Sequence, residues 1–167
     1  MAGKANIRSR AVNALKRLVA PVGDPVVAAV GRMRARRPRI LRVVPGAHAA
    51  GPKQAVYVHY DPRGLVHDYV RFAVRELAAN GYAVTFVSNA PELDEEGVAA
   101  LKPLVREIVH RRDVGYDFGA WRDGIERLPE TERLERLILA NDSVYGPVFP
   151  LGKALERAEA MDVDIFG

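Results

Sequence analysis

Short apolar runs alternate with longer mixed stretches along the C-terminal two-thirds of the chain. The runs that are β-branched and aromatic, as strands are, cover residues 55–60, 83–89, 107–111 and 136–141, and another begins at Val163. The stretches with helical spacing of apolar residues cover 67–80, 91–105, 120–128 and 151–161. This alternation predicts an α/β fold, with a mostly parallel open sheet and helices on both of its faces.

The helix expected at 67–80 has an apolar face that we expect to be buried. Its members are Tyr69, Phe72, Ala73 and Leu77, and Asn80-Gly81 closes the helix as a C-cap.

The first third of the chain has a different pattern. Residues 7–19 have the spacing of a basic amphipathic helix, and a second apolar stretch at 26–33 leads into the arginine-rich "RMRARRPR". Small residues at 43–52, "VVPGAHAAGP", predict a linker. We therefore expect a basic, partly helical segment and linker at 1–53, and one folded domain at 54–167.

The net charge of the chain changes sign at the same place. Residues 1–53 hold 12 Lys/Arg and one acid, a net +11, whereas residues 54–167 hold 13 Lys/Arg and 20 Asp/Glu, a net −7. A nucleic-acid binder carries positive charge on its folded domain, so no nucleic-acid partner is expected. Residues 1–42 predict peripheral contact with the anionic inner face of a membrane; the alternative is a solvated helix or one that packs on another domain.

Several classes of protein are disfavoured by what the sequence lacks. Without cysteine there are no disulfides, thiolate nucleophiles or Cys-based metal sites, which fits a cytoplasmic location. No apolar run approaches the ~20 residues that span a bilayer, and Asp24 with its neighbouring prolines argues against a signal peptide. Motifs of dinucleotide enzymes, P-loop NTPases and α/β-hydrolases do not occur.

Polar residues collect where the predicted strands end. In parallel sheets ligands bind beyond the carboxyl ends of the strands, so these loops are the candidate site. The candidate ligand-binding residues are His59, Asp61, Asn89, Gly115, Tyr116, Asp117, Asn141, Asp142, Ser143 and Tyr145. No catalytic residue is assigned.

Each candidate also has a structural interpretation. Asp117 suits a helix N-cap, His59 could be a buried histidine satisfied by backbone, and the glycines could serve tight turns. Tyr116 and Trp121 could stack on a base or sugar, or anchor the core. Arg111 and Arg112 could meet a diphosphate or form surface ion pairs, and Asp142 could be a solvent-facing turn carboxylate.

Four segments together resemble the rhamnan synthesis protein F family, over roughly residues 55–167. They are "YVHYDPRGLVHDYV", "FVSNAPEL", "RRDVGYDFGAWRDGI" and "LILANDSVYGPVFPL". The resemblance implies a glycosyltransferase of bacterial rhamnose-containing surface polysaccharides. Its partners would be a nucleotide-sugar donor and a lipid-linked or polysaccharide acceptor, and the ten candidate residues would bind the nucleotide sugar.

The resemblance also implies the nucleotide-binding half of a GT-A-like fold, with "NDS" at 141–143 in the place of an Asp-x-Asp metal motif. Asp142 would then hold Mg²⁺ or Mn²⁺ against the diphosphate, or Asn141 and Ser143 would hydrogen-bond ribose or phosphate instead. Asp113 stands where the family more often has Asn.

Because the chain ends at "DIFG", where family members continue into an acceptor-binding half, we expect only the donor-binding part here. A non-catalytic interaction module and a nucleotide-sugar-binding regulatory domain are the alternative functions.

Overall fold

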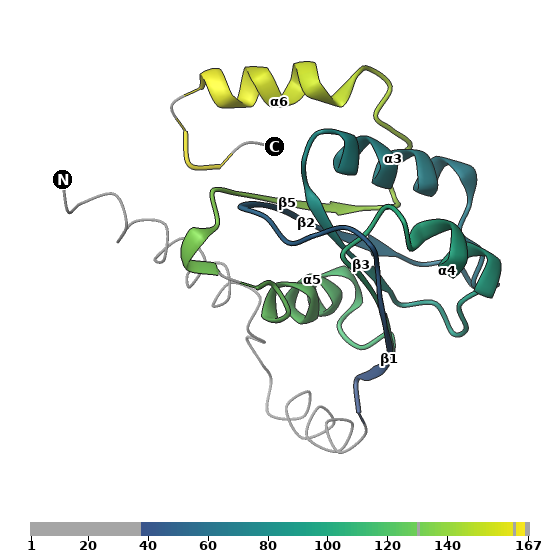
Figure 1. Cartoon of the computed structure of the whole chain (residues 1–167). Coiled ribbons are helices and arrows are strands. Elements are labelled where there is room, and N and C mark those ends of the chain that lie inside the picture. Colours follow the sequence, from purple (N-terminus) through teal and green to yellow (C-terminus); the bar gives the residue numbers. More distant parts are fainter. Residues whose placement is uncertain (1–37, 130, 162, 166–167) are drawn as a thin grey trace.

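The computed structural model describes residues 38–129, 131–161 and 163–165, and strands and helices alternate along them (Figure 1). The strands are β1 (Ile40–Pro45), β2 (Lys53–His59), β3 (Ala83–Ser88), β4 (Glu107–Arg111) and β5 (Arg136–Asn141). The helices are α3 (Asp68–Ala79), α4 (Glu95–Leu101), α5 (Tyr116–Glu126) and α6 (Leu151–Ala160), with a 3-10 turn at Thr131–Arg133.

All five strands form one sheet in the order β1-β4-β3-β2-β5. β4, β3, β2 and β5 run parallel, and β1 pairs antiparallel with β4 at one edge. Strand β2 lies between β3 and β5, and its Val56 pairs with Thr85 on one side and with Leu139 on the other. The prediction of a mostly parallel sheet is confirmed.

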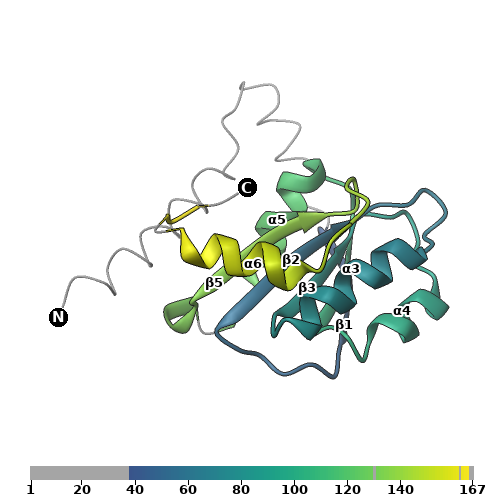
Figure 2. The ribbon, with the colours of Figure 1, turned by 90° about the horizontal axis from the view of Figure 1, so that it is seen from above.

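Helices cover both faces of the sheet, as predicted. On one face α3 lies between α6 and α4, and α5 packs on the other (Figures 1 and 2). The first face buries residues such as Tyr57, Phe86 and Ile108, and the second buries Val56 and Val87 against α5. Strands buried on both faces explain why their sequences read as nearly continuous apolar runs.

Strand β1 is the largest departure from the predicted organisation. The linker expected at 43–52 is wrong in its first three residues, which belong to this strand and bring part of the basic segment into the sheet. Arg42 on β1 forms an ion pair with Glu95, and Arg39 lies 3.2 Å from Asp123. The two arginines thus contact the acidic domain. The helix expected at 7–19 lies outside the described residues.

The other corrections concern element ends and one face. The helical stretch expected at 91–105 is confined to Glu95–Leu101, and the helix expected from residue 120 begins at Tyr116. The described residues 163–165 are not in a strand. On α3 the buried residues are Val70, Ala73, Val74 and Leu77, whereas Phe72 is exposed. The predicted closure of this helix at Asn80-Gly81 is confirmed, with Gly81 at φ 82°.

Candidate functional site

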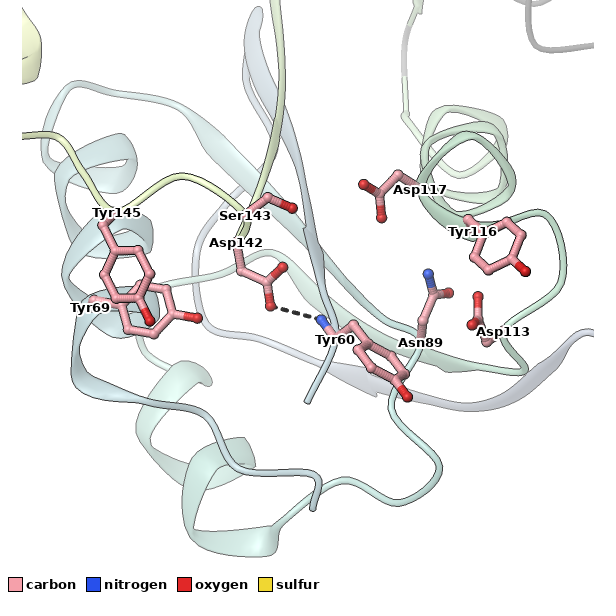
Figure 3. Close-up of a pocket in the computed structure, with 9 residues that line it drawn as sticks. All are labelled: Tyr60, Tyr69, Asn89, Asp113, Tyr116, Asp117, Asp142, Ser143 and Tyr145. Carbon is pink, nitrogen blue, oxygen red and sulfur yellow. Dashed lines mark hydrogen bonds between the residues drawn. The ribbon is translucent and has the colours of Figure 1, made fainter. Parts of the chain in front are cut away.

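A pocket opens at the carboxyl ends of the parallel strands, where the topology predicts a ligand site. Its volume is about 570 Å³, within the range of small-molecule sites. The lining side chains are Tyr60, Tyr69, Asn89, Asp113, Tyr116, Asp117, Asp142, Ser143 and Tyr145 (Figure 3). They come from the segments after β2, β3, β4 and β5, and from α3 and α5.

Two clusters of the sequence, "GYDFGAW" at 115–121 and "NDSVYGP" at 141–147, meet at this pocket. Asn141 Nδ2, at the end of β5, donates a 2.8 Å hydrogen bond to Asp117 Oδ2 in the first turn of α5. Close by, Trp121 Nε1 donates to the carbonyl of Ala140 over 3.1 Å. These bonds fix the start of α5 against β5, and side chains from both clusters line the same pocket. Their role in binding a nucleotide sugar stays a prediction.

The "GYDFGAW" stretch is the beginning of α5, and its composition follows from that geometry. Gly115 is the N-cap with φ 81°, and Tyr116 follows with φ 48°, a left-handed conformation that is uncommon for a residue with a side chain. Asp117 is therefore inside the helix and is not its N-cap. Tyr116 is 78% exposed and lines the pocket. Backbone strain of this kind is concentrated at functional sites.

Steric constraints explain why position 119 is a glycine. A Cβ there would lie 2.2 Å from the carbonyl oxygen of Val114 and 3.1 Å from Arg111 Nη2. The residue before the helix and the buried arginine therefore leave no room for a side chain.

Asp142, like Asp117, is a half-buried carboxylate of the site. Its backbone N–H donates to the carbonyl of Val58, and its Oδ2 accepts a 2.8 Å hydrogen bond from the backbone N–H of Tyr60. Burial raises the pKa of Asp142 above its usual value, although the Tyr60 N–H and the nearby His59 ring oppose this shift. Asp142 and Asp117 point toward each other across the pocket (Figure 3).

The pocket is strongly acidic. Asp113, Asp117 and Asp142 line it, and none of its nine described lining residues is Lys or Arg. A bare diphosphate would meet unfavourable charge here, whereas a divalent cation would offset it. Across residues 38–129, 131–161 and 163–165, no group of three or more His, Asp or Glu is placed to hold a metal ion. Asp142, the predicted metal-binding residue, would therefore be the protein's contribution to such a cation site. Oxygens of the bound molecule would have to complete the coordination shell of the cation.

Two tyrosines form one wall of the pocket. The rings of Tyr69 on α3 and Tyr145 after β5 stack with centroids 4.3 Å apart and planes 27° apart. Tyr69, Tyr60 and Asp113 line the pocket but are absent from the predicted binding residues. Tyr69 lies on the face predicted to be core, and periodicity does not separate a core position from a pocket wall.

Four of the predicted binding residues do not line the pocket. His59 is buried, with Nδ1 3.1 Å from Ser88 Oγ and Nε2 3.1 Å from the Leu65 carbonyl, which matches its structural interpretation. Asp61 instead accepts hydrogen bonds from the backbone N–H groups of Arg63 and Leu65. The remaining two support residues that line the pocket. Gly115 is the N-cap of α5, and Asn141 donates a hydrogen bond to Asp117.

The two arginines considered for diphosphate binding do not line the pocket either. Arg111 is fully buried beneath it and pairs with Asp123 at 2.8 Å, and Arg112 is exposed elsewhere. Within the described part of the chain, no helix has the length and apolar character needed to cross a membrane.

Comparison with known proteins gives the chain a family. A family model described as "Rhamnan synthesis protein F" matches residues 84–167, half of the chain, including both clusters. The "Uncharacterized protein y4gN" of Sinorhizobium fredii is 29% identical over 126 residues, which are 75% of this chain and 32% of that protein. The chain thus spans about a third of that relative's length. No solved structure matches the chain. Because the family match covers half of the sequence, this chain belongs to the rhamnan synthesis protein F family.

Proposed function

We propose that this chain is the donor-binding part of a glycosyltransferase that builds bacterial cell-surface polysaccharide, with rhamnosyl transfer from a nucleotide sugar as its reaction. The observation that carries the proposal is the acidic, tyrosine-walled pocket formed where the two family clusters meet. The parallel sheet with its ligand pocket beyond the strand ends is compatible with the nucleotide-binding half of a GT-A-like fold. The family's description supports the link to polysaccharide synthesis.

In this proposal the residues of the chain bind and orient the donor. Asp142 would hold Mg²⁺ or Mn²⁺, and the cation would neutralise the charge that develops on a departing nucleoside diphosphate. Asp117, fixed by Asn141, accepts hydrogen bonds from ribose or sugar hydroxyls. Tyr69 and Tyr145 offer a stacked aromatic wall for a base or sugar ring. The acceptor and its general base are not assigned to residues of this chain.

Attachment to the inner face of a membrane through residues 1–42 is proposed on charge alone. It would keep the protein near a lipid-linked acceptor.

A non-catalytic interaction module is the second candidate. The observation that favours it is the exposed apolar loop after the pocket, where Val144, Val148 and Phe149 are 68–82% exposed. Such a module would bind a partner without transferring sugar.

Donor binding tests the proposal directly. UDP-, dTDP- and GDP-sugars are titrated into the full chain by calorimetry, with and without Mn²⁺. We expect one donor class to bind more tightly with Mn²⁺, and Asp142→Asn to weaken that binding about 10- to 100-fold, as expected for losing a charged ligand. The amide can still accept the Tyr60 N–H, so the pocket should keep its shape.

Asp68→Asn, a surface change outside the pocket, is the matched control and should bind like the wild type. Binding of no donor by the wild type, or equal binding by Asp142→Asn, would overturn the proposal. Donor binding without any sugar transfer in the longest natural form of the protein would favour the module.

A further inference from the structure

A buried arginine lies beneath the pocket and holds one of its lining side chains. Arg111, the last residue of β4, has no solvent exposure. Its Nε donates to Asp123 Oδ2 over 2.8 Å, its Nη2 donates to the Val114 carbonyl over 2.8 Å, and its Nη1 donates to Asn89 Oδ1. Every nitrogen of the guanidinium thus has a partner from a different segment.

The charge of Arg111 is balanced within the fold. Asp123 on α5 is buried with it, and its other oxygen, Oδ1, lies 3.2 Å from Arg39 Nη2 and 3.4 Å from Arg122 Nη2. A buried ion pair with further hydrogen bonds holds its members in one geometry, because loss of either partner would leave an uncompensated charge. Arg111 is therefore a fixed point against which Asn89 is oriented.

This contact determines which way the Asn89 amide faces. Arginine has only hydrogen-bond donors, so the oxygen of the amide must face it. The amide nitrogen then lies on the opposite side, and Figure 3 shows it directed toward the interior of the pocket, on the side of Asp117. Asn89 is 3% exposed and lines the pocket, so its N–H groups meet whatever occupies that space.

A fixed donor is unusual in this pocket. The carboxylates of Asp113, Asp117 and Asp142 accept hydrogen bonds when ionised, and hydroxyl groups either donate or accept. Among the nine described lining residues, Asn89 supplies the sole side-chain nitrogen. A ligand that places an acceptor oxygen at Asn89 gains a hydrogen bond, and one that places a donor there leaves two donors facing each other.

We propose that Arg111 is a positioning residue that holds the Asn89 amide with its N–H groups toward the pocket, and that this amide selects ligands with an acceptor oxygen at that point. The inference rests on the proposed function, in which the ligand is a nucleotide sugar and the acceptor is one of its oxygens. Asn89 contacts the ligand, and Arg111 acts only through Asn89.

Asn89→Asp replaces the amide nitrogen that faces the pocket with an oxygen and keeps the oxygen that faces Arg111. The carboxylate still accepts from Arg111, but it presents an acceptor to the pocket in place of a donor. We expect the variant to fold with an unchanged or higher thermal midpoint and to bind the preferred nucleotide sugar at least 10-fold more weakly. Asn80→Asp adds the same charge outside the pocket and should bind the donor like the wild type.

Arg111→Lys tests positioning through a double-mutant cycle. Lysine keeps a positive charge near Asp123, but its single ammonium lacks the fork that reaches Asp123, Val114 and Asn89 together. We expect several-fold weaker donor binding by Arg111→Lys alone and no further loss when it is added to Asn89→Ala. A general structural defect would instead weaken both backgrounds by the same factor.

The outcomes separate the two proposals. If the wild type binds no nucleotide sugar, the proposed function fails and selection by Asn89 fails with it. If the wild type binds and Asn89→Asp binds equally well, or if the losses of Arg111→Lys and Asn89→Ala multiply, only the inference about these two residues is overturned. Should Arg111→Lys not fold, Asn89→Asp alone decides the orientation of the amide.

Discussion

At the scale of single residues, the three carboxylates of the pocket have different environments. Asp142 is half-buried and held by the Tyr60 N–H, Asp117 is fixed by Asn141, and Asp113 is exposed at the rim. Burial disfavours the charged form of Asp142 and raises its pKa. The residue proposed to hold a cation is thus a carboxylate whose negative charge is disfavoured by its burial in the protein.

Asp142→Asn should therefore change stability in a pH-dependent way. A carboxyl whose pKa is raised in the folded state contributes stability that is present below its unfolded pKa and is lost as pH rises through its folded pKa. Relative to the wild type, the variant should gain stability without added metal as pH rises above about 4, the unfolded pKa of an aspartate. Urea unfolding at several pH values measures this. A wild type that gains on the variant toward pH 7 would show that the Tyr60 and His59 contacts outweigh burial.

At the scale of elements, the start of α5 organises the pocket. Two consecutive left-handed residues, Gly115 and Tyr116, turn the chain from β4 into the helix, and Gly119 lets Val114 approach the first turn. The same turn presents Tyr116 and Asp117 to the pocket and packs against Arg111. The residues that begin helix α5 therefore also form part of the pocket.

Gly119→Ala should consequently destabilise the protein even though alanine favours helices. The added Cβ would meet a backbone carbonyl at 2.2 Å, and a helix backbone has little freedom to retreat. Overpacking of this kind costs about 1–3 kcal/mol, against about 1 kcal/mol gained in helix propensity. Chemical denaturation should show a net loss. Gly51→Ala, which meets nothing within 4 Å, is the control and should unfold like the wild type.

The sequence predicted the elements best where both faces of a strand are buried. β2 and β3 have long apolar runs because helices cover both sides of the sheet. The pattern of apolar residues and the residue types therefore both indicate strands. β1 was missed because it is an edge strand with a mostly exposed surface and an arginine at its centre, which looks like the end of the basic segment.

The site was predicted in outline because its residues cluster at strand ends. Asn89, Tyr116, Asp117, Asp142, Ser143 and Tyr145 line the pocket as expected. The errors concern orientation, which depends on tertiary contacts. His59 points into the core beneath the pocket, and Asn141 is occupied by Asp117. No sequence pattern indicated that Arg111 would be buried and would orient Asn89.

At the scale of the whole molecule, stability and site share the same edge of the sheet. His59 bridges β2, β3 and the loop before α3 through Ser88 and the Leu65 carbonyl. Burial lowers the pKa of His59, although Asp142 and Asp61 oppose that shift. The folded protein thus favours the neutral ring.

Acidification should therefore weaken the fold through His59. An unfolded histidine takes up a proton near pH 6.5, so its contribution to stability is fully present above that pH and is lost as pH falls toward the folded pKa. The free energy of unfolding should decrease by up to about 1.4 kcal/mol per pH unit over this interval.

His59→Gln should flatten the stability profile between pH 7 and pH 5.5, whatever its stability at pH 7. His48→Gln, a change near the surface, should leave the slope as it is in the wild type. Equal slopes for the wild type and His59→Gln would contradict the assignment of this pH dependence to His59.

The antiparallel pairing of β1 has a practical consequence for anyone cutting this chain into fragments. Starting a fragment at residue 54 would follow the change in charge along the sequence, but it would strip β4 of its neighbour from Glu107 to Arg111. The uncovered main-chain groups would then be available to pair with another molecule, a common origin of aggregation. A fragment that starts before Arg39 keeps β1 paired with β4 and keeps the ion pair between Arg39 and Asp123.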